Sequence, residues 1–175
     1  MIGCRNLILV GMMGAGKTTI GRSLARRLDM KFVDLDHEIE ERTGVPIAVI
    51  FDIEGETGFR ERESQILSEI AAAGPVVLAT GGGAVLNAEN RKTLAAKGYV
   101  AYLHAPPQLL YERTRHDRKR PLLQVADPLA KLTELVSVRD PLYREVADCV
   151  IDVSQDGVTQ VIHRLEQEYL KQCAH

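Results

Sequence analysis

Residues 11–18, GMMGAGKT, fit the pattern G-x-x-x-x-G-K-[ST], which cradles the phosphates of a nucleoside triphosphate. An apolar run precedes the motif and a helical pattern follows it, which is the context that the motif requires. Backbone N–H groups at the helix start can surround a phosphate, Lys17 can reach the β- and γ-phosphates, and the Thr18 hydroxyl can ligate magnesium. The sequence therefore predicts a triphosphate site formed by Gly14, Ala15, Gly16, Lys17, Thr18 and Thr19.

Two carboxylates follow the next apolar run. A magnesium-bound triphosphate normally needs an acidic residue at a neighbouring strand end, and the segment VVLATGGG offers none. Asp34 and Asp36 stand two residues apart, so both side chains face one side if the strand extends that far. We assign Asp34 to the metal, through water, and Asp36 to the phosphoryl acceptor. The alternative interpretation makes Asp36 the N-cap of a helix over residues 37–42.

Two arginines are ambiguous from their local sequence. Arg60 stands four residues after Glu56, a spacing typical of a solvated pair on a helix. Arg120 lies in the cation-rich segment 114–123, which is typical of a nucleic-acid patch, a solvated face or a lid over a triphosphate. The phosphate loop favours the lid, and within it we expect Arg120 to contact the γ-phosphate.

A third arginine, Arg139, precedes Pro141 by two residues. Because proline disfavours a helical conformation at the residue before it, we expect the preceding helix to end near Arg139. An arginine at that position can grip a carboxylate through two hydrogen bonds, or it can cap its own helix. The local sequence leaves both interpretations open.

The elements that must position these residues alternate along the chain. Short apolar runs predict strands over residues 6–10, 31–36, 76–80, 99–105 and 148–153. Helical patterns lie at residues 17–28, 56–73, 87–97, 106–115, 127–139 and 157–171. This alternation predicts a three-layer α/β/α fold with a central parallel sheet. Ligands of such folds bind at the carboxyl ends of the strands, where the candidate residues stand.

Composition limits the classes of function. The 175 residues suffice for one domain, and a formal net charge of -2 argues against nucleic-acid binding as the main function. The three cysteines are widely spaced without a Cys-x-x-Cys pair, so we expect no disulfide framework, no zinc site and a reducing cytoplasm. No stretch is long enough to span a bilayer, and no long apolar stripe indicates an obligate dimer. We therefore expect a cytoplasmic monomer without a membrane partner.

Six segments together give the chain a family resemblance. In order they are GMMGAGKTTIGRSLA, DLDHEIEERTG, FRERE, GGGAV, RPLL and RDPLYREVAD, and the sequence resembles shikimate kinases through nearly its whole length. The resemblance implies a nucleoside-monophosphate-kinase-like P-loop fold with a five-stranded sheet in the order 2-3-1-4-5. It also implies that ATP and shikimate react, with Mg²⁺, to give shikimate 3-phosphate and ADP. Residues 1–175 would form a single kinase domain, with an acceptor-binding insertion at about 34–61 and a lid at about 112–124.

The resemblance further implies roles for individual residues. The shikimate site corresponds to Asp36, Arg60, Gly81, Gly82, Gly83 and Arg139. Arg120 corresponds to a lid arginine on the phosphates, and Arg113 to an arginine against adenine. Lys17, Asp36 and Arg120 are then the candidate catalytic residues, and Asp36 would orient the 3-hydroxyl before accepting its proton late. The acceptor ring would rest on the glycine backbone, where any Cβ would occupy its space.

Two other functions stay compatible with these patterns. One is a kinase of the same fold that acts on another small polyol acid, such as gluconate. The other is an ATP-binding switch module that hydrolyses ATP slowly and signals through its lid. GGGAV and RDPLY favour shikimate, since gluconate kinases resemble this chain mainly in its first third.

The loop 153–157, VSQDG, departs from relatives that place a proline against adenine.

Overall fold

The computed structural model describes residues 5–174, and in them five strands form a parallel sheet. The strands are β1 (Asn6–Val10), β2 (Lys31–Asp34), β3 (Val76–Ala79), β4 (Gly98–His104) and β5 (Cys149–Asp152). Their order in the sheet is β2-β3-β1-β4-β5, with every neighbouring pair parallel. The predicted sheet and its strand order are confirmed.

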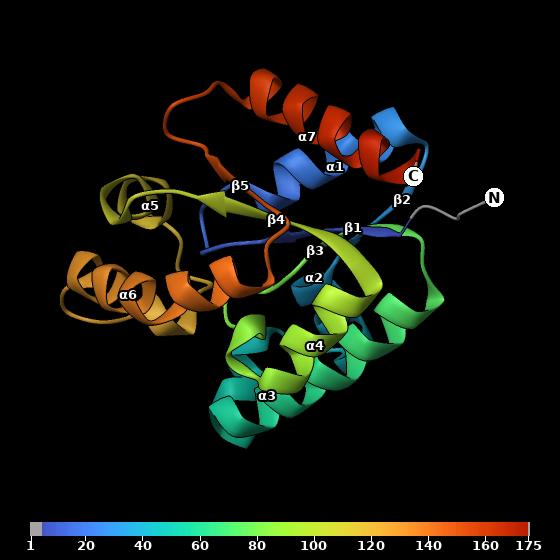
Figure 1. Cartoon of the computed structure of the whole chain (residues 1–175). Helices are drawn as coiled ribbons and strands as arrows, with labels where there is room; N and C mark the ends of the chain where they lie inside the picture. The colour runs from blue at the N-terminus through green and yellow to red at the C-terminus, as the bar shows by residue number, and fades with distance from the viewer. Residues whose placement is uncertain (1–4, 175) are drawn as a thin grey trace.

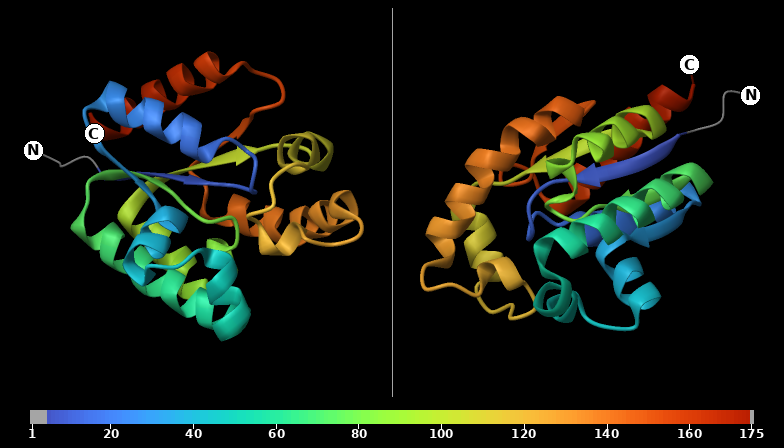
Figure 2. Two further views of the ribbon diagram at one scale, coloured as in Figure 1. Left: turned by 180° about the vertical axis from the view of Figure 1, so that it is seen from behind. Right: turned by 90° about the horizontal axis from the view of Figure 1, so that it is seen from below.

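Helices cover both faces of this sheet. They are α1 (Lys17–Leu28), α2 (Leu35–Thr43), α3 (Ile47–Ala73), α4 (Ala88–Lys97), α5 (Pro107–Thr114), α6 (Pro128–Val146) and α7 (Val158–Cys173), with 3-10 turns η1 (Ala84–Leu86) and η2 (Pro121–Leu123). Figures 1 and 2 show α1 and α7 packed together on one face, and α3 and α4 on the other. The helices α5 and α6 contact each other at the end of the sheet to which the β4 arrowhead points.

The central strand explains why the first apolar run is continuous. Residues 7–10 are completely buried, because β1 lies between β3 and β4 and has helices on both faces. A strand buried on both sides has no polar face, so its sequence does not alternate. Since the strands are parallel, the segments that follow β1, β2 and β3 meet at one edge of the sheet.

The strand β2 is shorter than predicted, because it ends at Asp34 and not at residue 36. The Asp34 carboxylate accepts a hydrogen bond from the His37 backbone N–H at 3.1 Å, so Asp34 is the N-cap of α2. Asp36 lies in the first turn of that helix. The alternative that made Asp36 the N-cap is therefore wrong, and the turn of helix, not a strand, sets where Asp36 points.

The helix α6 is longer than predicted, because it does not end near Arg139 but continues through Pro141 to Val146. The cost of Pro141 is local, since proline removes one backbone donor from the helical ladder. Arg139, Tyr143 and Val146 are each no more than 6% exposed. Packing of these side chains outweighs the local preference, and Arg139 lies inside a helix instead of at its end.

The helix α3 begins at Ile47, earlier than the predicted residue 56. Gly55 has a φ of 72° and interrupts the helix, so residues 47–54 and 56–73 form two segments joined at a kink. Phe51 of the first segment and Phe59 of the second have ring centroids 4.9 Å apart. The kink thus brings side chains of both segments to one place.

Two features bear on the expectations drawn from composition. Cys149 is a free thiol, whereas Cys173 is disulfide-bonded, so the expectation of no disulfide is wrong at Cys173. Sequence spacing did not reveal this bond, because a disulfide depends on the distance between two cysteines in space. Within residues 5–174, no helix combines the length and apolar character needed to cross a membrane.

Candidate active site

The phosphate loop runs from the end of β1 to the start of α1. Gly11, Gly14 and Gly16 have φ values of 147°, 84° and 101°, which residues with a Cβ rarely adopt. A Cβ at Gly14 would also lie 2.8 Å from the Thr114 side chain of α5. Within the described residues no side chain caps the start of α1. The N–H groups at this helix start can therefore bind an anion.

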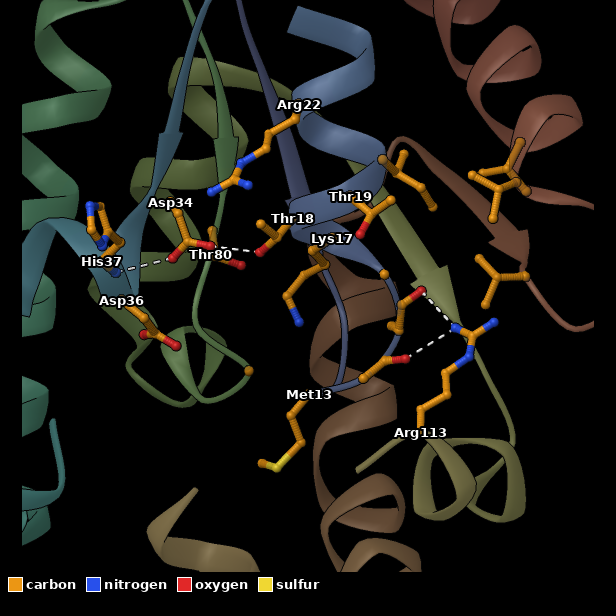
Figure 3. A pocket seen from close by; sticks show the side chains of 18 of the residues that line it. Met13, Lys17, Thr18, Thr19, Arg22, Asp34, Asp36, His37, Thr80 and Arg113 are labelled. Carbon is orange, nitrogen blue, oxygen red and sulfur yellow. Dashed lines mark hydrogen bonds between the residues drawn. The ribbon is translucent and has the colours of Figure 1, made fainter. Parts of the chain in front are cut away.

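Lys17 folds back over this loop. Its Nζ donates hydrogen bonds to the carbonyl oxygens of Gly11 and Met12 at 2.6 and 2.8 Å. Burial lowers the pKa of Lys17 to about 7, and the nearby Asp36 carboxylate opposes that shift. A bound polyphosphate would favour the charged ammonium and offer it stronger acceptors than the two carbonyls. Figure 3 shows the side chain beside the loop.

A cavity of about 750 Å³ opens over the loop (Figure 3). It contains every residue of the predicted triphosphate site, namely Gly14, Ala15, Gly16, Lys17, Thr18 and Thr19. Arg113 donates from Nη1 to the carbonyl oxygen of Gly14 at 3.0 Å, so this arginine lies against the loop. Val153 and Val158 form an apolar wall beside it. The size, the phosphate loop and the apolar wall together suit a nucleotide.

Thr18 and Asp34 form the candidate metal site. The Thr18 hydroxyl donates to Asp34 Oδ2 at 2.6 Å, and this contact is drawn in Figure 3. The other carboxylate oxygen, Oδ1, caps α2, so Asp34 is held by α1 and α2 together. Hydroxyl and carboxylate oxygens are ligands that Mg²⁺ accepts, with phosphate and water completing its shell. The pair therefore fits this ion.

A second cavity of about 240 Å³ adjoins the first. It contains every residue of the predicted acceptor site, namely Asp36, Arg60, Gly81, Gly82, Gly83 and Arg139. Both cavities are lined by Met13, Asp36, Glu40, Gly82 and Arg120. A group transferred from one cavity to the other would pass between Asp36 and Arg120.

The three glycines that follow Thr80 leave room for charged side chains. A Cβ at Gly81 would lie 2.7 Å from Glu63 Oε2 and 2.8 Å from Asp36 Oδ1. A Cβ at Gly83 would collide with the Arg60 guanidinium. The sequence prediction gave this space to a bound ring, whereas in the structure the polar lining of the acceptor cavity fills it. A Cβ at Gly81 or Gly83 would therefore require the ends of these charged side chains to move away from the backbone.

Arg60 is bound by two glutamates. Its Nη2 lies 3.3 Å from Glu56, as the local spacing predicted, and its Nη1 lies 3.0 Å from the fully buried Glu63. Arg60 Nε and Glu63 Oε2 are buried and have no hydrogen-bond partner within the described residues. Burial raises the pKa of Glu63 to about 7, against the charge of Arg60. Unsatisfied buried polar atoms are costly, so a polar ligand or an ordered water at this position would stabilise both of them.

Arg120 and Arg139 approach the acceptor cavity from two other elements. Arg120, just before η2, donates from Nε to Asp117 Oδ2 at 2.9 Å and lines both cavities. Arg139 of α6 is 2% exposed and lines the acceptor cavity. Burial and the neighbouring Asp34 raise the pKa of Asp36, while Lys17, Arg120 and Arg60 oppose that shift. Asp36 therefore lies near the cations Lys17, Arg120 and Arg60, with a second carboxylate, Asp34, close by.

Comparison with known proteins identifies the family. The model of the shikimate kinase family matches residues 13–170. The chain belongs to the shikimate kinase family. A shikimate kinase from Dechloromonas aromatica is 61% identical over 165 residues, which are 94% of this chain and 90% of that protein. The structure of a shikimate kinase from Acinetobacter baumannii in complex with shikimate has a TM-score of 0.94 and 48% identity, covering 98% of this chain and 96% of that one.

More distant structures share the fold alone. A gluconokinase from Sinorhizobium meliloti has a TM-score of 0.57 and 14% identity, over 97% of this chain and 93% of its own. Both the sequence identity and the TM-score are much lower for the gluconokinase than for the shikimate kinase, so the comparisons favour the shikimate kinase interpretation of the sequence over the gluconate kinase interpretation. The family is that of the shikimate kinases, as the six segments indicated.

Sequence reasoning missed several residues of the site. Glu63 stands in the quoted segment FRERE, yet nothing local distinguishes it from its exposed neighbours. Phe51 and Phe59 line the acceptor cavity from both sides of the kink at Gly55. Tyr143 was hidden because the helix was expected to end before it. The glycine at position 55 was the local signal that could have indicated the kink, because glycine disfavours a continuous helix.

The raised pKa of Glu63 predicts a change of stability with pH. The native pKa of about 7 exceeds the ordinary value of 4.5, so unfolding releases a proton between these two values. The contribution of Glu63 to the free energy of unfolding therefore falls as pH rises through this window, by on the order of 2 to 3 kcal/mol. The melting temperatures of the parent and of Glu63→Gln are compared at pH 5 and at pH 8. Between pH 5 and pH 8, the melting temperature of the variant should rise relative to that of the parent. Glu61→Gln, an exposed neighbour on the same helix, should show no such trend. The same difference at both pH values would contradict the burial argument.

Proposed function

We propose that the chain transfers the γ-phosphoryl group of ATP to the 3-hydroxyl of shikimate, giving shikimate 3-phosphate and ADP. The observation that carries the proposal is the pair of adjoining cavities, one on the phosphate loop and one lined by arginines, which meet at Asp36, Gly82 and Arg120. A loose transition state needs alignment and charge neutralisation more than covalent help. Two sites joined at a cation-lined passage supply both.

The nucleotide side rests on five residues. Lys17 would leave its two carbonyls and bind the β- and γ-phosphates, and Arg120 would neutralise charge on the transferred group. Thr18 and Asp34 would hold Mg²⁺, with Asp34 acting through water. When bound, this ion neutralises phosphate charge. Arg113, which lies against the loop at Gly14, would cover the adenine.

The acceptor side rests on the chemistry of shikimate, a small carboxylate that bears hydroxyls. Arg60 and Arg139 would grip the carboxylate, because a guanidinium fork matches its two oxygens. Asp36 would accept the hydrogen bond of the 3-hydroxyl and take its proton late in the transfer. We also propose that the enzyme works in the cytoplasm as a monomer, with no nucleic-acid or membrane partner.

The proposal is tested by incubating the protein with ATP and Mg²⁺ and measuring the release of ADP with and without shikimate. We expect release close to zero without an acceptor and rapid release with shikimate, while gluconate at the same concentration gives no increase. Equal release with and without shikimate would support the switch module instead. Stimulation by gluconate but not by shikimate would contradict the assignment of the acceptor.

The arginine assignment predicts a selective loss of acceptor binding. Arg139→Ala should raise the KM for shikimate at least about tenfold, since a charge-assisted hydrogen bond contributes roughly 1.5 to 3 kcal/mol. The KM for ATP should change much less. Arg139→Lys should recover only part of the loss, because an ammonium lacks the planar fork. The exposed Arg144 of the same helix, which pairs with Asp140 at 2.8 Å, provides the control variant Arg144→Ala. Equal losses for ATP and shikimate would return Arg139 to a purely structural role.

A further inference from the structure

One buried hydroxyl binds a residue that lines both cavities, and this hydroxyl has no assigned role. The Tyr143 hydroxyl donates a hydrogen bond to the carbonyl oxygen of Gly82, the residue that lines both cavities. The Tyr143 hydroxyl oxygen also lies 3.5 Å from Met12 Sδ of the phosphate loop. Tyr143 has no exposed surface and Met12 is 2% exposed, so this junction is dry. The hydroxyl therefore contacts the glycine run and the phosphate loop at once.

The same hydroxyl also faces Arg139. Tyr143 follows Arg139 by one helical turn, so both side chains lie on one face of α6. Burial raises the pKa of Tyr143, and the nearby Arg139 guanidinium opposes that shift through its charge. A hydroxyl can donate one hydrogen bond while accepting another, so one oxygen can serve Gly82 and Arg139 together.

Gly82 has little freedom between these neighbours. The position of a Cβ at Gly82 lies 3.3 Å from Arg139 Nη1, 3.5 Å from Met13 N and 3.6 Å from Gly11 O. Gly82 is thus packed between the acceptor arginine and the backbone of the phosphate loop. A small displacement of the Gly82 carbonyl would change the position of the acceptor cavity relative to the phosphate loop.

The Tyr143 ring packs against a second tyrosine ring. Its centroid lies 4.9 Å from that of Tyr102, at an interplanar angle of 35°. The Tyr102 hydroxyl donates to Asp140 Oδ1 at 2.7 Å, and Asp140 also pairs with Arg144. The ring is therefore held by packing, and the hydroxyl is left to hold Gly82.

We propose that Tyr143 is a positioning residue for phosphoryl transfer, whose hydroxyl fixes Gly82 and Arg139 relative to the phosphate loop. The inference rests on the proposed function, because it treats the second cavity as the shikimate site. Removing the hydroxyl would leave the ring in place and release the Gly82 carbonyl. Alignment of the acceptor with the γ-phosphate would suffer, while the nucleotide would still bind to the loop.

The variant Tyr143→Phe tests this inference. We expect the KM for shikimate to rise about fivefold to tenfold, the size of effect that one neutral hydrogen bond supports, and kcat to fall by a similar factor. The KM for ATP should change by less than about twofold. Tyr102→Phe is the matched control, because it removes a buried tyrosine hydroxyl from the same ring pair without touching Gly82. We expect this control to keep the parent values of both KM and kcat, and both variants should be melted alongside.

Each other outcome overturns the inference. Parent values of kcat and of the shikimate KM in Tyr143→Phe would mean that the hydroxyl has no positioning role. Equal losses for ATP and shikimate, with a large fall in melting temperature, would mean that it only stabilises the fold. Equal effects in Tyr102→Phe would assign the loss to the ring pair. A parent enzyme without shikimate-dependent ADP release would overturn the proposed function together with this inference, whereas an active parent isolates the failure to Tyr143.

Discussion

Replacing Lys17 with Met should leave the fold intact and lower the turnover of shikimate-dependent ADP release by on the order of 100-fold or more. The ammonium binds the carbonyls of Gly11 and Met12 at 2.6 and 2.8 Å, within the loop that would hold the phosphates. Met has a similar length and an apolar end, so the variant keeps the packing and loses the charge. Charge on the γ-phosphoryl oxygens grows in the transition state, and one fewer cation then opposes it.

The burial of Lys17 makes a stability control necessary. Burial lowers its pKa to about 7, so the native protein holds this proton less tightly than the unfolded chain, whose lysine has the ordinary pKa of 10.5. The contribution of Lys17 to stability therefore rises with pH between these two values, and Met removes that dependence. Lys92→Met, on an exposed side chain of α4 that pairs with Glu89 at 2.9 Å, is the matched variant and should keep full turnover. A Lys17→Met enzyme whose turnover lies within about twofold of the parent would contradict the role assigned to this lysine.

The nucleotide half of the site was predictable because its signals are local. Gly14, Gly16, Lys17 and Thr18 stand within five consecutive positions, and the left-handed φ values of the two glycines follow from the turn between β1 and α1. A motif of this kind carries its own geometry, since the backbone that binds the phosphate is the motif itself. The sheet order and the metal pair of Thr18 and Asp34 needed one step more, the meeting of parallel strand ends at one edge.

The acceptor half could not be predicted from local patterns. Arg60 and Arg139 are 79 positions apart; the local sequence made Arg60 one half of a solvated helix pair and left the role of Arg139, at an expected helix end, open. Their standing came from the family resemblance, and the structure adds the physical cause, which is burial around one cavity. Glu63 illustrates the limit, because a glutamate flanked by charged residues in FRERE is typical of a solvated face, yet it is 0% exposed.

Two boundary errors have one origin. The local rules at Asp36 and Pro141 were correct as preferences, but tertiary contacts decided both positions. At the first, Asp34 bonds to Thr18 and caps α2, which ends the strand before Asp36. At the second, buried Tyr143 holds α6 against the glycine run after the proline. Both places lie at the candidate site, where residues serve contacts that local sequence does not encode.

Replacing Asp36 with Asn should produce the other large loss of turnover, on the order of 100-fold or more, with a smaller change in the shikimate KM. Asn keeps the size of the side chain and one acceptor oxygen, so the 3-hydroxyl can still be bound. It cannot take the proton, and it removes the negative charge that faces Lys17, Arg120 and Arg60. Orientation and proton acceptance are lost together, whereas binding depends mainly on the arginines.

The pH dependence separates this role from simple packing. Burial first, and the charge of Asp34 second, raise the pKa of Asp36 above its ordinary value of 3.8, so this carboxylate takes up a proton at a higher pH than an ordinary aspartate does. Turnover of the parent should therefore fall on the acid side as pH drops through this raised pKa, and the residual turnover of Asp36→Asn should lack that limb. Glu41→Gln removes a carboxylate from the exposed side of the same helix, where it pairs only with His37 at 3.3 Å among the contacts described, and should keep the parent profile. An Asp36→Asn enzyme that retains both the turnover and the acid limb of the parent would assign the proton to another group. The neighbouring carboxylate Glu63, with its pKa of about 7 and its oxygen 2.7 Å from the Cβ position of Gly81, would then be the residue to replace next.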